Sequence, residues 1–323
     1  MNDILLATAQ RMIDQRNALK LAFRYESSYL YPVCACALMK TGNPVPTDEL
    51  KAAKELLKKQ TGAFSNFRNT MIMPSCCYLA MHQNDPAYLQ TSMDFYQHLK
   101  KIFGSSEYTA LLSLMLPDLQ EADHLIDRGQ TLYQLMKKEH PFLTSSEDKP
   151  AAVLLAASAK TDEQIIQDME AAYRFLKGSL SFADSNGLQA VSQLLAGGDT
   201  IPALERLMAI RDHLEHAERK YGKGYELSAL AALAMCDPDP QRTAEDILEA
   251  DAFLKNQKGY GVLGHGAKIR LMHAAMLVSA ARNESDSSPY MMSSALSMAI
   301  MQNAVLCCAV TSSAVSASSS SSH

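Results

Sequence analysis

The residues best suited by type and spacing to do chemistry lie in a glycine-rich segment, Gly259 to Gly266. It holds four glycines in eight residues. Because glycine has no Cβ, backbone amides in such a segment can approach a ligand closely, and amides ahead of a helix start can hold an anion. Tyr260, His265 and Lys268 are therefore candidate ligand-binding residues, and His265 and His273 could act as an acid or base.

The alternative for this segment is a connecting loop whose glycines allow left-handed turns. Tyr221-Gly-Lys-Gly224 occupies the equivalent place about forty residues earlier. No strand precedes the glycines, as a dinucleotide-binding fingerprint would require. The connecting loop is the favoured interpretation, and the anion-binding loop stays open beside it.

Aromatic residues recur in the loops that we expect between successive helix pairs. If the chain curves, these loops gather on one edge and present aromatic and Arg or Lys side chains, the types that dominate binding hot spots. The favoured interpretation is that these aromatics staple the loops onto helix ends, and the binding surface stays open beside it. Phe67, Arg68 and Asn69 are further candidate ligand-binding residues. The other loop aromatics are Phe64, Phe103, Tyr108, Phe142, Phe182, Tyr221 and Tyr225.

Histidine and cysteine patterns predict no metal site. His213 and His216 lie three residues apart on one helix face, among charged residues that are typical of a solvated surface. The seven cysteines lack the two-residue gap at which two thiolates bind one zinc ion, and they lie in apolar runs. We expect reduced, mostly buried thiols and neither a metal nor a cofactor. The cysteines are Cys34, Cys36, Cys76, Cys77, Cys236, Cys307 and Cys308.

Motifs of the common enzyme classes are absent from the sequence. There is no Gly-Lys-Ser or Gly-Lys-Thr phosphate loop, no His-Glu-x-x-His and no Gly-x-Ser-x-Gly. The net charge is -5 and no basic stripe is present to neutralise nucleic-acid phosphates. Residues 1–15 carry Asp3, Arg11 and Asp14 and suit an amphipathic helix rather than a secretion signal. We therefore expect a cytoplasmic protein that does not bind nucleic acid.

The elements that must position the candidate residues are helices. Short Ala- and Leu-rich segments recur about every forty residues, and each is followed by a turn and a longer amphipathic segment. The short segments are apolar nearly all round, so neighbours must enclose them in an inner layer. The longer segments carry one apolar stripe, as at Leu89, Met93 and Tyr96, and should form an outer layer. The short segments begin near Tyr31, Met71, Tyr108, Pro150, Leu188, Leu227 and Ala267.

Polar turn residues precede the amphipathic segments. A side-chain oxygen there can accept a hydrogen bond from a free backbone N–H, and proline suits the first helical position. A line of aspartates could also bind a cation, but we expect each to cap its own helix. The turns are Thr47-Asp48, Asp85-Pro86, Asp162, Asp199-Thr200 and Asp239-Pro240.

The C-terminal stretch from Tyr290 to Ser322 contains no charged residue. A helix of about 25 residues here could cross a bilayer core of about 30 Å. Gln302, Asn303 and many serines dilute its hydrophobicity, so we expect a terminal helix that packs on the preceding helices. Membrane association and disorder are the alternatives, and residues 316–323 are expected to form a flexible Ser-rich tail.

Several of these features resemble one bacterial family. They are the spacing of the Ala-rich helix pairs, the region from Phe67-Arg68-Asn69 to Leu79-Ala80, and an end rich in Ala, Met, Gln and Ser that runs out in serines. The chain is similar, over nearly its whole length, to the uncharacterised domain-of-unknown-function family four thousand and three. The resemblance implies a bacterial helical protein and supplies no catalytic residues.

Together the patterns predict an all-α chain of about seven helix pairs, arranged as an open solenoid or a closed α/α toroid. Residues 1–315 would form one helical repeat domain. The leading functional hypothesis is a scaffold that binds a protein or peptide across its concave or loop-edge surface. The alternatives are an enzyme with an anionic small-molecule substrate at the loop face, and membrane association through the last helix. The sequence predicts no oligomeric state.

Overall fold

Fourteen α-helices form the framework of the described residues, which are 1–39, 44–260 and 264–283 of a computed structural model. The all-α prediction is confirmed, because no strand occurs in these residues. The odd-numbered helices are α1 (Asp3–Ala22), α3 (Thr47–Gln60), α5 (Pro86–Phe103), α7 (Ala122–Glu139), α9 (Asp162–Ser179), α11 (Thr200–His216) and α13 (Pro240–Lys255). The even-numbered helices are α2 (Leu30–Leu38), α4 (Ile72–Met81), α6 (Glu107–Met115), α8 (Lys149–Leu155), α10 (Ser185–Ala196), α12 (Leu227–Cys236) and α14 (Ala267–Asn283).

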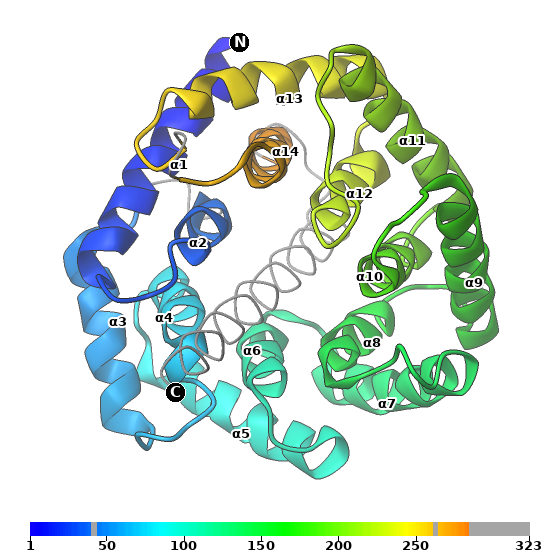
Figure 1. Ribbon diagram of the computed structural model, residues 1–323. Helices are drawn as coiled ribbons and strands as arrows, with labels where there is room; N and C mark the ends of the chain where they lie inside the picture. Colours follow the sequence, from blue (N-terminus) through cyan, green and yellow to red (C-terminus); the bar gives the residue numbers. More distant parts are fainter. Residues whose placement is uncertain (40–43, 261–263, 284–323) are drawn as a thin grey trace, which may run out of the picture.

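The helices form two layers, with the odd-numbered helices outside and the even-numbered helices inside (Figure 1). The inner helices bury most of their residues, and in α2 all nine residues are buried. The outer helices bury one stripe, which in α5 includes Leu89, Tyr96 and Leu99. Because a helix without a polar face must be covered by neighbours, the apolar pattern alone sets this layering. Each inner helix begins within three residues of its predicted start.

The last helix pair lies against the first. Helix α1 contacts both α13 and α14, and α2 contacts α14, as Figure 1 also shows. The amino group of Met1 forms an ion pair with Glu249 of α13 at 2.9 Å. We call this junction between the α13–α14 and α1–α2 pairs the seam. That each pair is a copy of one repeating unit stays a prediction.

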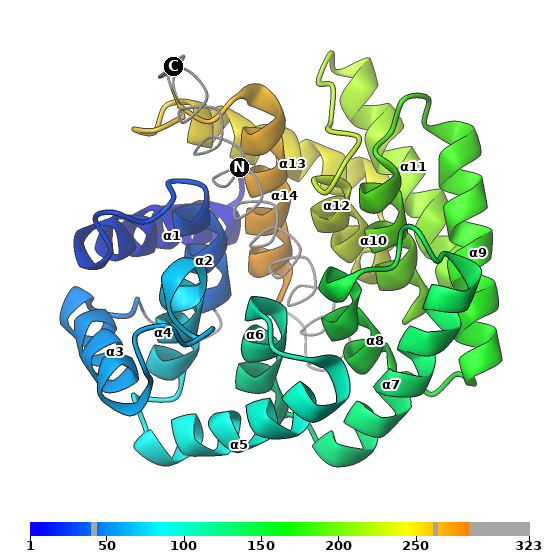
Figure 2. The same ribbon diagram turned by 60° about the horizontal axis from the view of Figure 1, so that its bottom comes forward.

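The segments that lead from an outer helix to the next inner helix lie together. Hydrogen bonds link neighbouring segments, including Asn66 Nδ2 to Ser105 Oγ at 2.9 Å and the Asp184 amide to the Lys223 carbonyl at 3.1 Å. The segments before α12 and α14 both lie at the top of Figure 2. We call this side the loop face, formed by residues 23–29, 61–71, 104–106, 140–148, 180–184, 217–226 and 256–266, of which 261–263 are not described.

The shorter turns that lead from inner to outer helices are held by basic side chains. Arg128 of α7 donates to the carbonyl oxygens of Ala156 and Ser158, at 2.8 and 2.7 Å, where α8 ends. Arg206 donates to the Ala234 carbonyl at 2.5 Å in the last turn of α12. Such carbonyls have no partner within their own helix, so a cation there satisfies them and complements the helix dipole.

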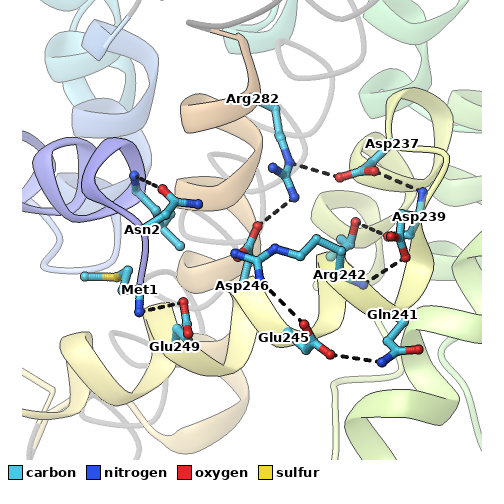
Figure 3. Close-up of polar contacts among 12 residues, drawn as sticks. Met1, Asn2, Asp237, Asp239, Gln241, Arg242, Glu245, Asp246, Glu249 and Arg282 are labelled. Carbon is cyan, nitrogen blue, oxygen red and sulfur yellow. Dashed lines mark hydrogen bonds and ion pairs between the residues drawn. The ribbon is translucent and has the colours of Figure 1, made fainter.

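The turn between α12 and α13 has its own ionic network (Figure 3). Arg282, near the end of α14, pairs with Asp237 at 2.9 Å and with Asp246 of α13 at 2.6 Å. Arg242 also pairs with Asp246, at 2.7 Å. Burial raises the pKa of Asp246, and the two guanidinium groups oppose that rise. The network therefore ties α14 to the preceding turn.

The predicted helix caps are correct at two turns, correct in position but without the cap hydrogen bond at a third, and wrong at the other two. Asp85 accepts from the Ala87 amide and Asp239 from the Arg242 amide. Asp162 is not the cap, because Thr161 caps α9 and the Asp162 carboxylate binds Arg128 instead. Helix α3 begins at Thr47 after Pro46, and Asp199 precedes α11 without forming a cap hydrogen bond.

Several predictions fall outside the described residues: the terminal helix after Tyr290, the tail at 316–323, and Cys307 and Cys308. Among the helices that are described, none is both long and apolar enough to span a membrane.

Candidate functional site

The candidate residues Phe67, Arg68 and Asn69 fix the loop that leads into α4. Phe67 is buried and packs its ring edge-on against Tyr96, with the ring centres 5.2 Å apart. Arg68 donates from Nη1 to the Thr61 carbonyl at 3.2 Å. Asn69 has a φ of 57°, in the left-handed region that asparagine tolerates better than most residues. These contacts join the loop to α5 and hold its own backbone, so they support a stapling role.

The glycine-rich segment, Gly259 to Gly266, places Tyr260 and His265 together at the seam. Tyr260 is buried, and His265, also buried, lies 5.3 Å from it between ring centres. The ring of Tyr29, just before α2, lies 5.1 Å from that of His265. Lys268, by contrast, is exposed on the first turn of α14. The seam therefore brings Tyr260 and His265 together with a residue of the first helix pair.

Two further buried residues complete this group. His273 of α14 is completely buried, and its Nδ1 lies 3.0 Å from the Tyr260 hydroxyl. Arg16 of α1 is only 9 % exposed, and its guanidinium carbon lies 5.7 Å from the centre of the Tyr260 ring. We call Arg16, Tyr29, Tyr260, His265 and His273 the seam cluster. The sequence pointed to His273 without a partner and did not point to Arg16, which lies in an amphipathic helix far away along the chain.

The surroundings keep both histidines neutral. Burial lowers the pKa of His265, and the positive charge of Arg16 adds to the effect. Burial lowers the pKa of His273 well below its ordinary value, with further lowering from His265 and Arg16. Burial also raises the pKa of Tyr260. At neutral pH, Arg16 is thus the charged member of the seam cluster.

The histidines predict a pH dependence of stability. The unfolded chain takes up protons on them near pH 6.5, whereas the folded chain resists protonation, so the free energy of unfolding should fall as the pH drops from about 7 to about 5. His273→Asn keeps an acceptor for Tyr260 and should remove up to about 1.4 kcal/mol per pH unit of that slope. Urea unfolding of both proteins at pH 5, 6 and 7 measures it.

The comparison of parent and variant is needed because other groups titrate in the same range. Burial raises the pKa of Asp148 to about 6, so this carboxyl favours the folded state on acidification. Its contribution is common to both proteins and cancels in the difference. Equal slopes for the parent and His273→Asn would contradict the prediction.

A second polar cluster lies on the loop face and was missed at the sequence level. Asp148 accepts from Gln193 Nε2 at 2.6 Å and from the Ser145 amide at 2.7 Å, and Tyr225 donates to Glu147 at 3.3 Å. A carboxyl with a pKa near 6 could exchange protons, but here both oxygens are already bound. Asp148 therefore caps the turn before α8 and links it to α10. Its signal was an aspartate two residues before Pro150.

Four of the five described cysteines fit a packing role, and the fifth, Cys236, is half-buried at the end of α12. Cys34, Cys36, Cys76 and Cys77 are buried free thiols of α2 and α4. Burial raises the pKa of Cys36 and of Cys76 to about 12, so neither is a reactive thiolate. In residues 1–39, 44–260 and 264–283, no three His, Cys, Asp or Glu side chains gather where they could hold a metal ion.

Fold and site thus define a two-layered, all-helical protein with a buried polar cluster at its seam. The chain belongs to the family described as "Protein of unknown function (DUF4003)", whose model matches residues 16–308, and the predicted resemblance is confirmed. The uncharacterized protein YeaA of Bacillus subtilis (strain 168) is 30 % identical over 147 residues, which are 43 % of this chain and 44 % of that protein. The chain thus matches less than half the length of this relative. No solved structure matches it.

Proposed function

We propose that the chain is a closed ring of seven repeated helix pairs, with residues 1–315 as one domain, whose loop face binds a segment of a partner protein. One observation carries the proposal. Four aromatic side chains on the loop face are at least 96 % exposed, and they are Tyr25, Phe64, Phe142 and Phe182. Exposed aromatic side chains supply much of the energy at protein interfaces once a partner covers them.

These four side chains differ from the aromatics that staple loops. Phe67, Tyr221 and Tyr260 are buried under their loops, whereas the exposed four contribute almost no buried area to the fold. Phe182 also has a φ of 58°, in the left-handed region that is a strained conformation for a bulky residue. An exposed aromatic in strained backbone lowers stability, so its presence is better explained by binding than by folding.

The distribution of the four side chains favours an elongated partner. They stand before α2, α4, α8 and α10, on four separate helix pairs. A protein segment that crosses the loop face with apolar side chains can contact them in turn, as partners of helical repeat proteins do on extended surfaces. A compact self-association patch would instead need them side by side.

A photo-reactive amino acid at Phe142 or Phe182 tests the proposal in the cell of origin. We expect one discrete cross-linked protein from these positions and none from Phe175, an outer-helix residue that is 46 % exposed. The identified partner is then purified and titrated. Replacing Phe64, Phe142 and Phe182 together by Ala should weaken binding about tenfold or more, and Phe175→Ala should change it less than about twofold. Equal binding by both variants, or a cross-link only to a second copy, would refute the proposal.

Phe182→Gly separates binding from folding. Glycine removes the left-handed strain, worth about 1–2 kcal/mol, and adds about 0.5–1 kcal/mol of unfolded-state entropy. Urea unfolding should therefore show equal or slightly higher stability, while partner binding weakens. A clear loss of stability would show that Phe182 serves the fold.

We also propose a cytoplasmic location, and we keep an enzyme and a membrane-associated protein as the alternative functions. The free thiols of α2 and α4 support a reducing compartment such as the cytoplasm. An enzyme with an anionic substrate would use the loop face near Tyr260 and His265. Membrane association would use residues after Tyr290, outside the described part of the chain.

A further inference from the structure

We propose that the seam cluster is a binding site for a small monocarboxylate, held by the Arg16 guanidinium and the Nε2–H of His273. The site is independent of the four exposed aromatic side chains Tyr25, Phe64, Phe142 and Phe182. Its residues come from α1, from α14 and from the segment between α13 and α14, so it exists only where the last helix pair meets the first.

The first support is a buried cation without a matching anion. Arg16 is 9 % exposed, and its hydrogen-bond partner among the described residues is the Asn17 side chain, at 3.1 Å. Its guanidinium also lies 5.7 Å from the centre of the Tyr260 ring. Both of these groups are neutral. The other buried arginine among the described residues, Arg211, faces a carboxylate, that of Glu215, at 2.9 Å. A buried charge is costly unless it is paired, so the guanidinium provides a site for an anion.

The second support is a buried donor without an acceptor. The Tyr260 hydroxyl lies 3.0 Å from His273 Nδ1. Because the Arg16 cation lies on the Tyr260 ring, it attracts the lone pairs of the hydroxyl oxygen, so we assign the hydroxyl proton to the bond with Nδ1. With Nδ1 as the acceptor, the neutral imidazole carries its proton on Nε2. This atom is buried and has no hydrogen-bond partner among the described residues. A buried N–H group without an acceptor is strongly unfavourable, and an oxyanion bound there would accept its hydrogen bond.

Charge and donor geometry select a carboxylate from among the oxyanions. Burial and Arg16 keep both histidines neutral, so the seam cluster offers one positive charge. One carboxylate balances that charge, whereas phosphate carries more charge than one guanidinium neutralises. The planar fork of Arg16 matches the two oxygens of a carboxylate. His265 borders the loop face, where its neighbours Gly264 and Gly266 are exposed.

The test uses the full chain with ¹⁵N-labelled histidine and sodium acetate as the probe, against chloride and inorganic phosphate at the same ionic strength. We expect the spectrum of His273 to show a proton on Nε2, and that signal to shift saturably with acetate and not with chloride. Arg16→Gln should weaken acetate binding about tenfold or more, the ratio for one charge-assisted pair. Arg24→Gln, the same change at an exposed arginine of the loop face, should leave it unchanged.

Several outcomes would overturn the site. They are a proton on Nδ1, no saturable shift with acetate, stronger binding of phosphate than of acetate, or equal loss in Arg16→Gln and Arg24→Gln. The wild-type spectra report the position of the His273 proton and the response to acetate, so they test the site even if Arg16→Gln does not fold.

One further variant tests for a ligand supplied by the chain itself. The acidic side chains outside the described residues are Glu284 and Asp286. Acetate binding that occurs only after Glu284→Gln and Asp286→Asn would show that the chain fills its own site, against the proposal. Partner cross-linking at Phe142 does not depend on Arg16, so failure of the carboxylate site and failure of the loop-face proposal give different results.

Discussion

Arg128→Met is expected to lower the free energy of unfolding by about 3 kcal/mol. The guanidinium pairs with Asp162 at 2.8 Å and also donates to the carbonyl oxygens of Ala156, Ser158 and Lys160. The Arg128 and Asp162 side chains are only 20 % and 24 % exposed, so water replaces the lost donor poorly. Methionine fills a similar volume but leaves the carbonyls at the end of α8 without a partner.

Two companion variants sharpen this prediction, each measured by urea unfolding. Arg128→Lys keeps the charge, but one ammonium group cannot reach all four acceptors that the planar guanidinium of Arg128 contacts. We therefore expect roughly half of the loss in the free energy of unfolding. Lys51→Met removes a charge that pairs with Asp48 at 2.9 Å on the exposed face of α3, and it should cost less than about 0.5 kcal/mol. Equal effects of Arg128→Met and Lys51→Met would show that the turn does not need its cation.

The layering of the fold could be predicted because it depends on composition along single segments. Helix α12 runs Leu-Ser-Ala-Leu-Ala-Ala-Leu-Ala from Leu227 to Ala234, and every one of these residues is buried. No outer position could accept such a segment. The role of Arg128 could not be predicted in the same way. Its carbonyl partners lie about thirty residues further along the chain. They give no signal in the sequence, because every residue has a backbone carbonyl.

The candidate site was predictable only in part, for a related reason. Tyr260 and His265 stand in a glycine-rich segment that is conspicuous by composition. Arg16 occupies an ordinary position in α1 and becomes a neighbour of Tyr260 only because the last pair packs against the first. The seven short segments are compatible with an open or a closed arrangement, since helical periodicity fixes faces and not curvature. Contacts across the seam were therefore invisible in the sequence.

Helix capping shows how tertiary partners change a local prediction. Asp85 and Asp162 both precede amphipathic segments, so both were expected to cap. Asp85 does so, because no cation competes for its carboxylate in the described residues. At α9 the sequence offers Thr161 as well, which forms a capping box with Gln164 and leaves the Asp162 carboxylate to Arg128. Which of two adjacent acceptors caps is decided by the neighbouring helix.

Gly187→Ala is expected to lower the free energy of unfolding by about 2–3 kcal/mol, although alanine is the better helix former. A Cβ at this position of α10 would lie 2.5 Å from the Gly224 carbonyl carbon and 2.7 Å from its Cα. Both atoms are backbone, so relief requires the segment 217–226 to move. Such a shift would strain the hydrogen bonds of Asp184 to Lys223 and of Tyr225 to Glu147.

The matched control is Gly178→Ala on α9, where an added Cβ meets nothing within 4 Å. The same substitution should there raise stability by about 0.5–1 kcal/mol, because only helix propensity changes. The two variants thus have opposite predicted signs in one urea-unfolding experiment. If Gly187→Ala were as stable as Gly178→Ala, the close approach of α10 to Gly224 would be wrong. The hydrogen bonds that join segments 140–148, 180–184 and 217–226 depend on the same close approach, so they would be wrong as well.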